Sequence, residues 1–151
     1  MFKKVFLIAA SLSILSACTI TQEVEPAELE QNVNVCIIEN PEVREGFLEE
    51  LTSVLAAKNI SHMVVNGSSI PDECKWTATY TARWSWDMSL YMAYAEIKVF
   101  HNGSLDGKAV YDSTGGSGNM NKFIKAEEKI KELVDELMQM KSASVFGRYF
   151  G

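Results

Sequence analysis

The stretch WTATYTARWSW, residues 76–86, alternates apolar and polar side chains over its whole length. The apolar positions are Trp76, Ala78, Tyr80, Ala82, Trp84 and Trp86, and the polar positions between them are Thr77, Thr79, Thr81, Arg83 and Ser85. A period of two places successive side chains on opposite faces of a β-strand. We therefore predict a half-buried strand whose inner face, alternating large and small side chains, leaves slots against which helices pack.

The residues that follow predict a hairpin. Residues 90–100 form an apolar strand, and Asn102-Gly103 is a turn sequence typical of hairpins. A two-residue loop would set Ala95 against Val110 and mix polar with apolar partners. A loop one residue longer pairs Val99 with Gly107, Ile97 with Ala109 and Ala95 with Tyr111. Because the second register keeps one face apolar, we predict the longer loop, with Gly103 in the left-handed bulge position.

Two strands and a helix are expected before this hairpin. Residues 33–39 and 60–65 are short β-branched runs, and a helix between them is expected to start at Asn40-Pro41, with Asn40 as its cap. The apolar stripe of this helix is Val43, Phe47, Leu51, Val54 and Leu55. A strand, a helix and a strand joined by short connections predict a right-handed crossover between parallel strands.

A second helix is expected after the hairpin, over residues 121–141, following a glycine-rich connector at 114–119. Its inner stripe is Phe123, Ile130, Leu133, Val134, Leu137 and Met138. The predicted fold class is α/β (α+β), with the order β-α-β-β-β-α and a mixed five-stranded sheet carrying two helices on one face. Residues 33–151 are expected to form this single domain, with a C-terminal tail from residue 142.

The beginning of the chain has the pattern of an export signal. Lys3 and Lys4 precede the uncharged apolar run 5–15, which is too short for a permanent membrane span. Leu15-Ser16-Ala17-Cys18 resembles the lipobox of bacterial lipoproteins, which implies removal of residues 1–17 and diacylation of Cys18. The alternative is an ordinary signal peptide with a chance cysteine beside its cleavage site.

The residues after Cys18 indicate a destination and a tether. In the enteric pattern of the lipoprotein family, aspartate after the cysteine retains the protein at the inner membrane, so Thr19 implies the outer membrane, with the domain facing the periplasm. Residues 18–32 are interpreted as a lipidated, acidic tether with too little apolar content to fold. The domain is therefore expected to lie close to the membrane.

The charge and the cysteine content limit which partners and which covalent links we expect. Removing residues 1–17 takes away Lys3 and Lys4, so 12 of 14 basic residues remain against 20 acidic ones, a net charge of about −8. Such a surface is repelled by nucleic acid, which we do not expect as a partner. Cys36 and Cys74 are the pair left after Cys18, and an oxidising compartment favours a disulfide over two buried free thiols.

Several stretches resemble a family of small uncharacterised proteobacterial lipoproteins. They include Cys36, Cys74-Lys75-Trp76, Tyr80–Asp87, Ala109–Ser113 and Lys122-Phe123-Ile124. The resemblance covers nearly the whole mature chain and implies no activity. In element order the chain is also similar to the amino-terminal domain of the Tol-system propeller protein and to lipoprotein activators of penicillin-binding proteins, a likeness of topology that sets no function.

Candidates for catalysis are few, and each has a simpler structural interpretation. His62 and His101 have no carboxylate motif beside them and are interpreted as solvated or structural. Residues 115–118 (GGSG) lack the lysine and spacing of a phosphate loop, and Asp87 is expected to cap a turn. We therefore expect no catalytic residues, no cofactor and no metal.

The better surface signal lies on the strand at 90–100. With a regular alternation, Leu90, Met92 and Tyr94 would form an apolar patch on the outer face of the sheet, a feature that often marks a partner site. The alternatives are that Phe146, Tyr149 and Phe150 of the tail cover the patch, or that a twist or bulge buries it.

These observations lead to a functional expectation. The chain is expected to be an outer-membrane lipoprotein with a non-enzymatic domain that binds an envelope protein or a peptidoglycan-associated partner. The alternatives are an activator of peptidoglycan synthesis, for which the tether is short, and an enzyme or ligand binder acting on a cell-wall component. A pocket beneath Trp76, Trp84 and Trp86 would favour ligand binding.

Overall fold

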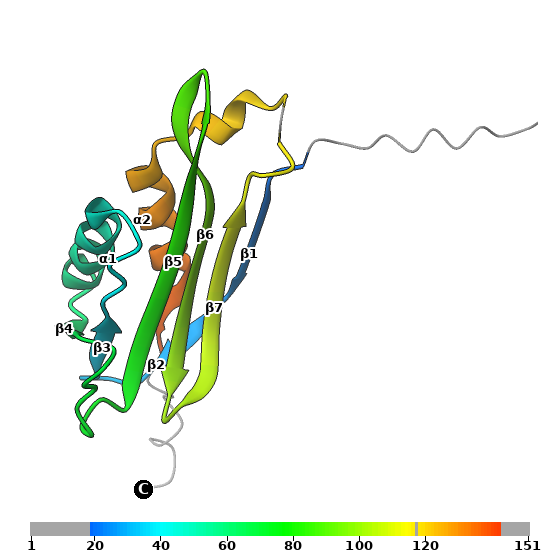
Figure 1. The fold of residues 1–151 in the computed structure, drawn as a ribbon. Coiled ribbons are helices and arrows are strands. Elements are labelled where there is room, and N and C mark those ends of the chain that lie inside the picture. The colour runs from blue at the N-terminus through cyan, green and yellow to red at the C-terminus, as the bar shows by residue number, and fades with distance from the viewer. Residues whose placement is uncertain (1–18, 117, 143–151) are drawn as a thin grey trace, which may run out of the picture.

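A six-stranded sheet with both helices packed on one face forms the body of the protein (Figure 1). The computed structural model describes residues 19–116 and 118–142. In spatial order the strands of the sheet are β1 (Thr21–Glu25), β7 (Ser104–Asp112), β6 (Ser89–His101), β5 (Trp76–Asp87), β3 (Asn34–Ile38) and β4 (Ser61–Val65). A second, two-stranded sheet pairs β2 (Ala27–Leu29) with β8 (Met138–Met140) in parallel.

The predicted class is confirmed at the level of a mixed sheet with two helices, and its strand count is wrong. Strand β3 pairs in parallel with β4 and with β5, whereas β5, β6, β7 and β1 pair antiparallel in turn. Between β3 and the second helix the chain runs β-α-β-β-β-β-α, one strand more than the predicted order. The main sheet has six strands because β1 adds to its edge.

Both helices are shorter than predicted. Helix α1 spans Glu45–Ala57, and Asn40 does not cap it: the Asn40 side chain accepts a hydrogen bond from the Glu42 amide and donates one to the Tyr80 carbonyl. Helix α2 spans Ala126–Leu137. A 3₁₀ turn, η1 (Met120–Phe123), precedes it, and β8 replaces the expected last turn.

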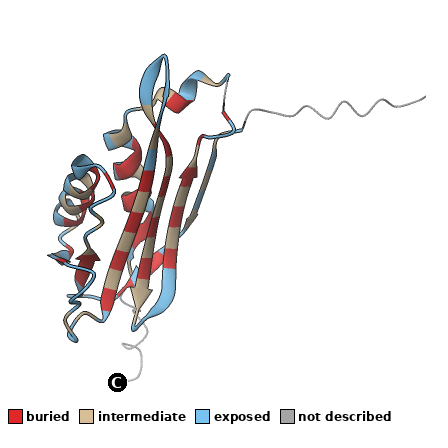
Figure 2. Cartoon of the chain, viewed as in Figure 1, coloured by how far each residue is buried: buried red, intermediate tan, exposed pale blue. Residues whose placement is uncertain are grey.

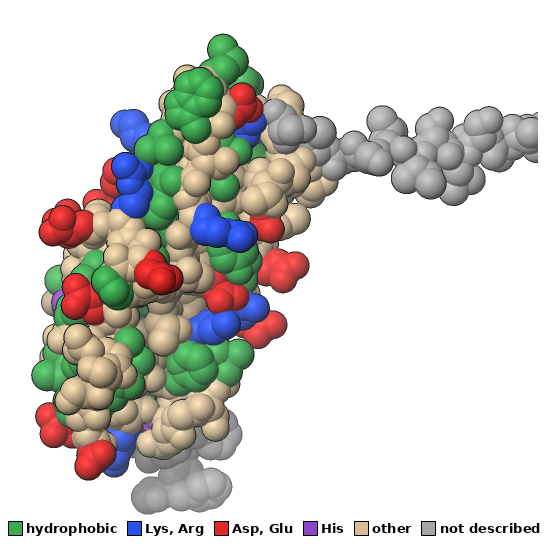
Figure 3. Space-filling model, in the orientation of Figure 1, with side chains coloured by type: hydrophobic (Ala, Val, Ile, Leu, Met, Phe, Trp, Pro, Cys, Tyr) green, Lys and Arg blue, Asp and Glu red, His purple; other side chains and the backbone are tan. Residues whose placement is uncertain are grey.

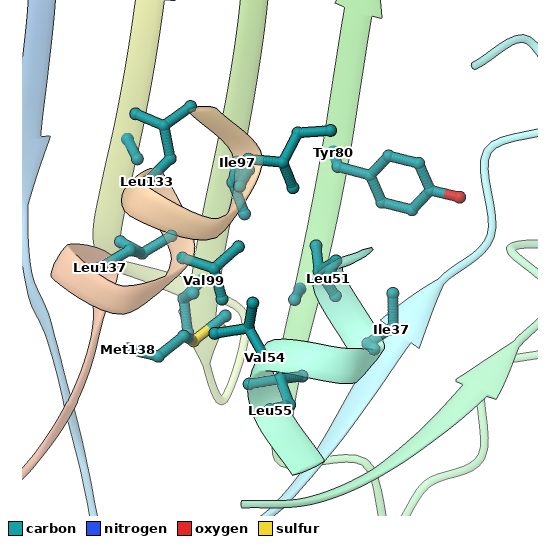
Figure 4. Packing of buried hydrophobic residues seen from close by; sticks show 14 of the residues in the cluster. Ile37, Leu51, Val54, Leu55, Tyr80, Ile97, Val99, Leu133, Leu137 and Met138 are labelled. Carbon is teal, nitrogen blue, oxygen red and sulfur yellow. The ribbon is translucent and has the colours of Figure 1, made fainter. Parts of the chain in front are cut away.

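The core lies between the helices and the inner face of the sheet (Figure 4). Four of the five residues predicted for the first helical stripe are buried on α1, and the fifth, Val43, is buried just before the helix begins. Ile130, Leu133, Val134, Leu137 and Met138 from the α2 region are also buried, whereas Phe123 is only half-buried. Strand β5 contributes Trp76, Ala78, Tyr80 and Ala82, as the alternation predicts. Buried and half-buried residues alternate along β5 and β6 until the helices end, and beyond that point the hairpin is exposed (Figure 2).

The predicted register of β6 against β7 is confirmed, although its cause differs. Val99 pairs with Gly107, Ile97 with Ala109 and Ala95 with Tyr111. The loop itself has only two residues, Asn102 and Gly103, both with positive φ. The additional residue sits in a bulge next to the loop, where the register shifts between Val99 and Phe100. The need to bury one apolar face therefore determines the register, and the bulge in the strand, not a longer loop, provides the additional residue.

The acidic tether is the largest error of the sequence interpretation. Residues 21–25 form β1 along β7, and residues 27–29 form β2, with Ala27 and Leu29 fully buried. The side-chain amide of Gln22 donates a 2.8 Å hydrogen bond to Glu132 on α2 and accepts a 2.8 Å hydrogen bond from Lys129 of the same helix. Lys129 also donates a hydrogen bond to Glu132. Contacts from far along the chain thus hold a segment whose composition alone would leave it unfolded.

The predicted disulfide between Cys36 and Cys74 is present, with the two Cα atoms 5.7 Å apart. Cys36 is fully buried on β3, and Cys74 precedes β5. The bond therefore ties the long loop after β4 to the parallel part of the sheet. The alternative of two free thiols is excluded.

Candidate functional site

The pairing of β5 with β6 is interrupted by a bulge. The pairing is regular from Trp76 to Arg83, and then the register shifts so that Trp84 pairs with Met92. The shift leaves Ala93 as an additional residue on β6, and both Met92 and Ala93 are buried. Residues on the two sides of the bulge therefore no longer follow one alternation.

This bulge overturns the predicted patch of Leu90, Met92 and Tyr94. Met92 lies in the core with only 2% of its surface exposed, and Leu90 stands at the end of the hairpin. Tyr94 is half-buried on the outer face, where the Arg83 guanidinium lies 4.8 Å from its ring centre. The three side chains do not form one surface, because the bulge buries Met92 and leaves Leu90 exposed. Phe146, Tyr149 and Phe150 lie outside the described residues.

The outer face carries a charged cluster where an apolar patch was expected. Glu96 contacts Lys98 at 2.7 Å and Lys108 at 3.4 Å, and it accepts a hydrogen bond from the Tyr94 hydroxyl. Burial raises the pKa of Glu96, but the hydrogen bonds and charges of Lys98 and Lys108 outweigh it and hold the pKa below its ordinary value. Burial, and then the Glu96 charge, raise the pKa of Tyr94. This cluster satisfies its own charges and indicates a solvated face.

Exposed apolar side chains gather at the turn of the β5–β6 hairpin (Figure 3). We call this region the apex and define it by four residues: Trp86 is 73% exposed, Met88 89%, Leu90 49% and, on the adjacent turn η1, Met120 75%. Lys122 of η1 bonds Asp87, and Phe123 packs edge-on against Tyr91. The hairpin is thus braced from one side, and no other part of residues 19–116 and 118–142 covers its apolar end.

The free edge of β4 is a second exposed apolar surface. β4 lies at one end of the sheet, with a strand on one side only in the described part of the chain. Its sequence SHMVV has no charged residue and no proline, and Met63 and Val64 are 37% and 45% exposed. Edge strands are usually protected by charge, proline or bulges. The sequence interpretation treated β4 as an ordinary strand and missed this edge, although its lack of charge was visible.

The opposite edge, β1, is protected. Its residues Glu23 and Glu25 are exposed and place negative charge along the strand. Side chains of Gln22 and Val24 face α2 and the core instead. The two edges of one sheet therefore differ, and of these two only β4 offers an uncharged template for a further strand.

The residues considered for catalysis are not brought together. His62 contacts the Ile60 carbonyl through Nδ1, and His101 stacks on Trp76 with ring centres 4.1 Å apart. Asp87 pairs with Lys122 and does not cap its turn. Among residues 19–116 and 118–142, no group of three or more His, Cys, Asp and Glu side chains could hold a metal ion.

The three tryptophans do not line one pocket. Trp76 is buried and Trp86 projects from the apex. Trp84 lines a small cleft between the helices, where Arg44 lies 5.6 Å from its ring centre. The arrangement gives no support to a ligand site beneath the whole aromatic face.

The signal region and Cys18 lie outside the described residues. In the part of the chain that the structure describes, every helix is too short or too polar to cross a membrane. Thr19, the first described residue, approaches Gly115, with its carbonyl oxygen 3.0 Å from where a Cβ on that glycine would lie. The start of the domain is thus fixed beside the connector that precedes η1.

Comparison with known proteins gives a fold and no family. No protein-family model matches the chain, and no curated protein matches it. The PelC dodecamer from Paraburkholderia phytofirmans is similar in structure, with a TM-score of 0.56 at 14% identity over 80% of this chain and 98% of that one. A leucine-to-methionine variant of that dodecamer gives 0.55 at 12% identity, over 79% and 95%. At such identities the likeness establishes a shared fold alone.

Proposed function

We propose that the chain is an outer-membrane lipoprotein, acylated on Cys18, whose periplasmic domain is a non-enzymatic assembly module. The β4 edge is the binding surface, and further copies of the chain are the partners. The observation that carries this proposal is the contrast between an uncharged, partly apolar β4 edge and a charged β1 edge. An edge of this kind binds another chain through main-chain hydrogen bonds, with apolar side chains adding affinity.

The similar solved structures support self-assembly. They are described as dodecamers, and this chain matches nearly their whole length. A closed ring needs a repeated contact between two different surfaces of each subunit, and the β4 edge would be one of them. Activation of a peptidoglycan synthase fits less well, because residues 21–29 are folded and give the domain little reach from its anchor.

The test is the mass of the full mature protein, purified in detergent from cells and measured by light scattering after size-exclusion chromatography. Val64→Lys places a charge on the β4 edge, where the side chain is already half exposed. Ser53→Lys is the matched control, since it adds the same charge at an exposed position on α1. We expect the wild type and the Ser53→Lys variant to be multimers and the Val64→Lys variant to be a monomer.

Two results would contradict the proposal. A wild-type protein that stays monomeric at membrane-like concentrations excludes self-assembly. Multimers of equal mass for all three proteins would leave assembly in place and exclude the β4 edge as its surface. Mass spectrometry of the mature protein tests the anchor separately, since a diacylated Cys18 adds a mass that an unmodified cysteine lacks.

A further inference from the structure

We infer that the apex of the β5–β6 hairpin inserts into the lipid surface to which the chain is anchored. The inserting residues are Trp86, Met88 and Leu90, and Met120 is exposed on the adjacent turn η1. The inference rests on the proposed acylation of Cys18 and adds to it an orientation and a second membrane contact. It follows from where the described chain begins and from what that end of the molecule exposes.

First, residues 21–29 do not form the flexible tether that the sequence predicts, so the domain starts close to its anchor. Because β1 begins at Thr21 and is paired along its whole length with β7, only Thr19 and Ile20 separate Cys18 from the sheet. Ile20 packs against the core, and Thr19 lies against Gly115. A lipid on Cys18 therefore holds the domain directly at the bilayer surface, without room for the domain to turn away.

The second step is the direction in which the domain faces. Thr21 pairs with Asp112, and Asp112 pairs with Tyr94, so the three residues lie at one level of the sheet. Both β1 and β6 begin at the same end, the end toward which the β5–β6 hairpin projects (Figure 1). The anchored end of the domain is thus also the end that carries the apex.

The third step compares how far each part extends. Met88 is five residues from Arg83, the partner of Tyr94 on the strand without the additional residue, and five residues correspond to about 16 Å along a strand. The three residues from Cys18 to Thr21 can span at most about 10 Å. The apex therefore extends at least about 6 Å beyond the anchored residue. That excess is similar to the roughly 5–10 Å by which apolar faces of interfacial proteins enter the boundary between headgroups and acyl chains.

The chemistry of the apex suits that boundary. Trp86 is an aromatic residue of the type enriched at membrane interfaces, and Met88 and Leu90 flank it with flexible aliphatic surface. The only charged residue between Trp84 and Tyr91 is Asp87, and Lys122 neutralises it. Met88 has a φ of +60°, a conformation that favours glycine or asparagine, yet the turn presents a large apolar side chain there.

The experiment measures fluorescence quenching by lipids brominated in their acyl chains. The full acylated protein is reconstituted into phosphatidylcholine vesicles with and without brominated chains. We expect bromination to lower the emission of the wild-type protein, and we expect this loss to disappear in the Trp86→Phe variant, which keeps Trp76 and Trp84. Trp86 is largely exposed, so its replacement does not disturb the core.

A reporter at the opposite end is the matched control. Leu105 is 51% exposed beside the β6–β7 turn, far from the apex. In the Trp86→Phe background, Leu105→Trp should show no quenching, whereas Met88→Trp should restore it. Quenching of the Leu105→Trp reporter would mean that the domain lies in another orientation, and it would overturn the inference.

Two further outcomes separate this inference from the proposed function. If mass spectrometry shows Cys18 acylated but Trp86 is not quenched, the anchor stands and the inserted apex is wrong. If Trp86 is unquenched and its emission instead shifts to the blue as protein concentration rises, another copy of the chain covers the apex. An unmodified Cys18 in the mature protein overturns the anchor and, with it, the orientation.

Discussion

The two halves of the β5–β6 hairpin have similar sequences and different surroundings. From Trp76 to Ala82 the inner face of β5 is buried beneath the helices, and the disulfide at Cys74 fastens its start. From Trp86 onward an alternation of apolar and polar residues continues, and it projects beyond the helices. The alternation in an amphipathic strand therefore predicts that one face is apolar. Whether the rest of the protein or its surroundings cover that face depends on the tertiary structure.

The largest expected difference between the halves is in stability. Leu51 of α1 is fully buried over the covered half, so Leu51→Ala should lower the free energy of unfolding by about 3–5 kcal/mol. Met88→Ala in the exposed half should change it by no more than about 0.5 kcal/mol. Urea denaturation followed by circular dichroism measures both, and equal losses would mean that the apex is packed.

The disulfide should stabilise the covered half specifically. Cys36 and Cys74 are 38 residues apart, so the chain-entropy model predicts that their combined replacement by alanine costs about 3–4 kcal/mol. The emission of Trp86, at the other end of the hairpin, should not change while the domain remains folded. A shift in that emission under native conditions would show that the two halves are coupled.

A close backbone approach gives a smaller effect. A Cβ on Gly107 would lie 2.5 Å from the Ala27 backbone nitrogen, so Gly107→Ala should displace β2 and cost about 1–3 kcal/mol. Gly118→Ala is the control, because a Cβ there meets nothing within 4 Å. Hydrogen exchange of the β2 amides should increase in the first variant and stay unchanged in the second.

The smallest expected effect is on pH dependence. Hydrogen bonds from Lys129 and Gln22 lower the pKa of Glu132 below its ordinary value of 4.5. The folded state therefore binds fewer protons than the unfolded state in this range, and the resulting stability is present above 4.5 and lost as pH falls through the lower, folded value.

Glu132→Gln tests this assignment. The variant should be less stable than the wild type at neutral pH, and the gap should close on acidification, because the wild type loses a contribution that the variant already lacks. Thermal unfolding at a series of pH values measures the gap. Parallel curves for the two proteins would show that the network of Gln22, Lys129 and Glu132 contributes no pH dependence.

Much of the fold could be predicted from local patterns. The period of two in residues 76–86 predicts β5, and the requirement for one apolar face predicts the register of Val99 against Gly107. The helical stripe from Phe47 to Leu55 predicts the buried face of α1. In each case the information lies within one element or one hairpin, where side-chain spacing translates directly into geometry.

The candidate surfaces could not be predicted in the same way. The bulge after Arg83 moves Met92 into the core, and no spacing rule marks where a strand will take an additional residue. The exposure of Trp86 depends on where α1 and α2 begin, and the sequence pattern placed both helix starts about four or five residues too early.

The strand alternation, the helix stripes, the hairpin register and the pair of cysteines can be read from the sequence, because each depends on periodicity or composition over short distances. That residues 21–29 form strands follows from the tertiary structure alone. Their place depends on Lys129 and Glu132, over 100 residues away, and on the absence of a side chain at Gly107. An acidic segment with few apolar residues cannot offset its own loss of conformational entropy, and distant contacts must do so.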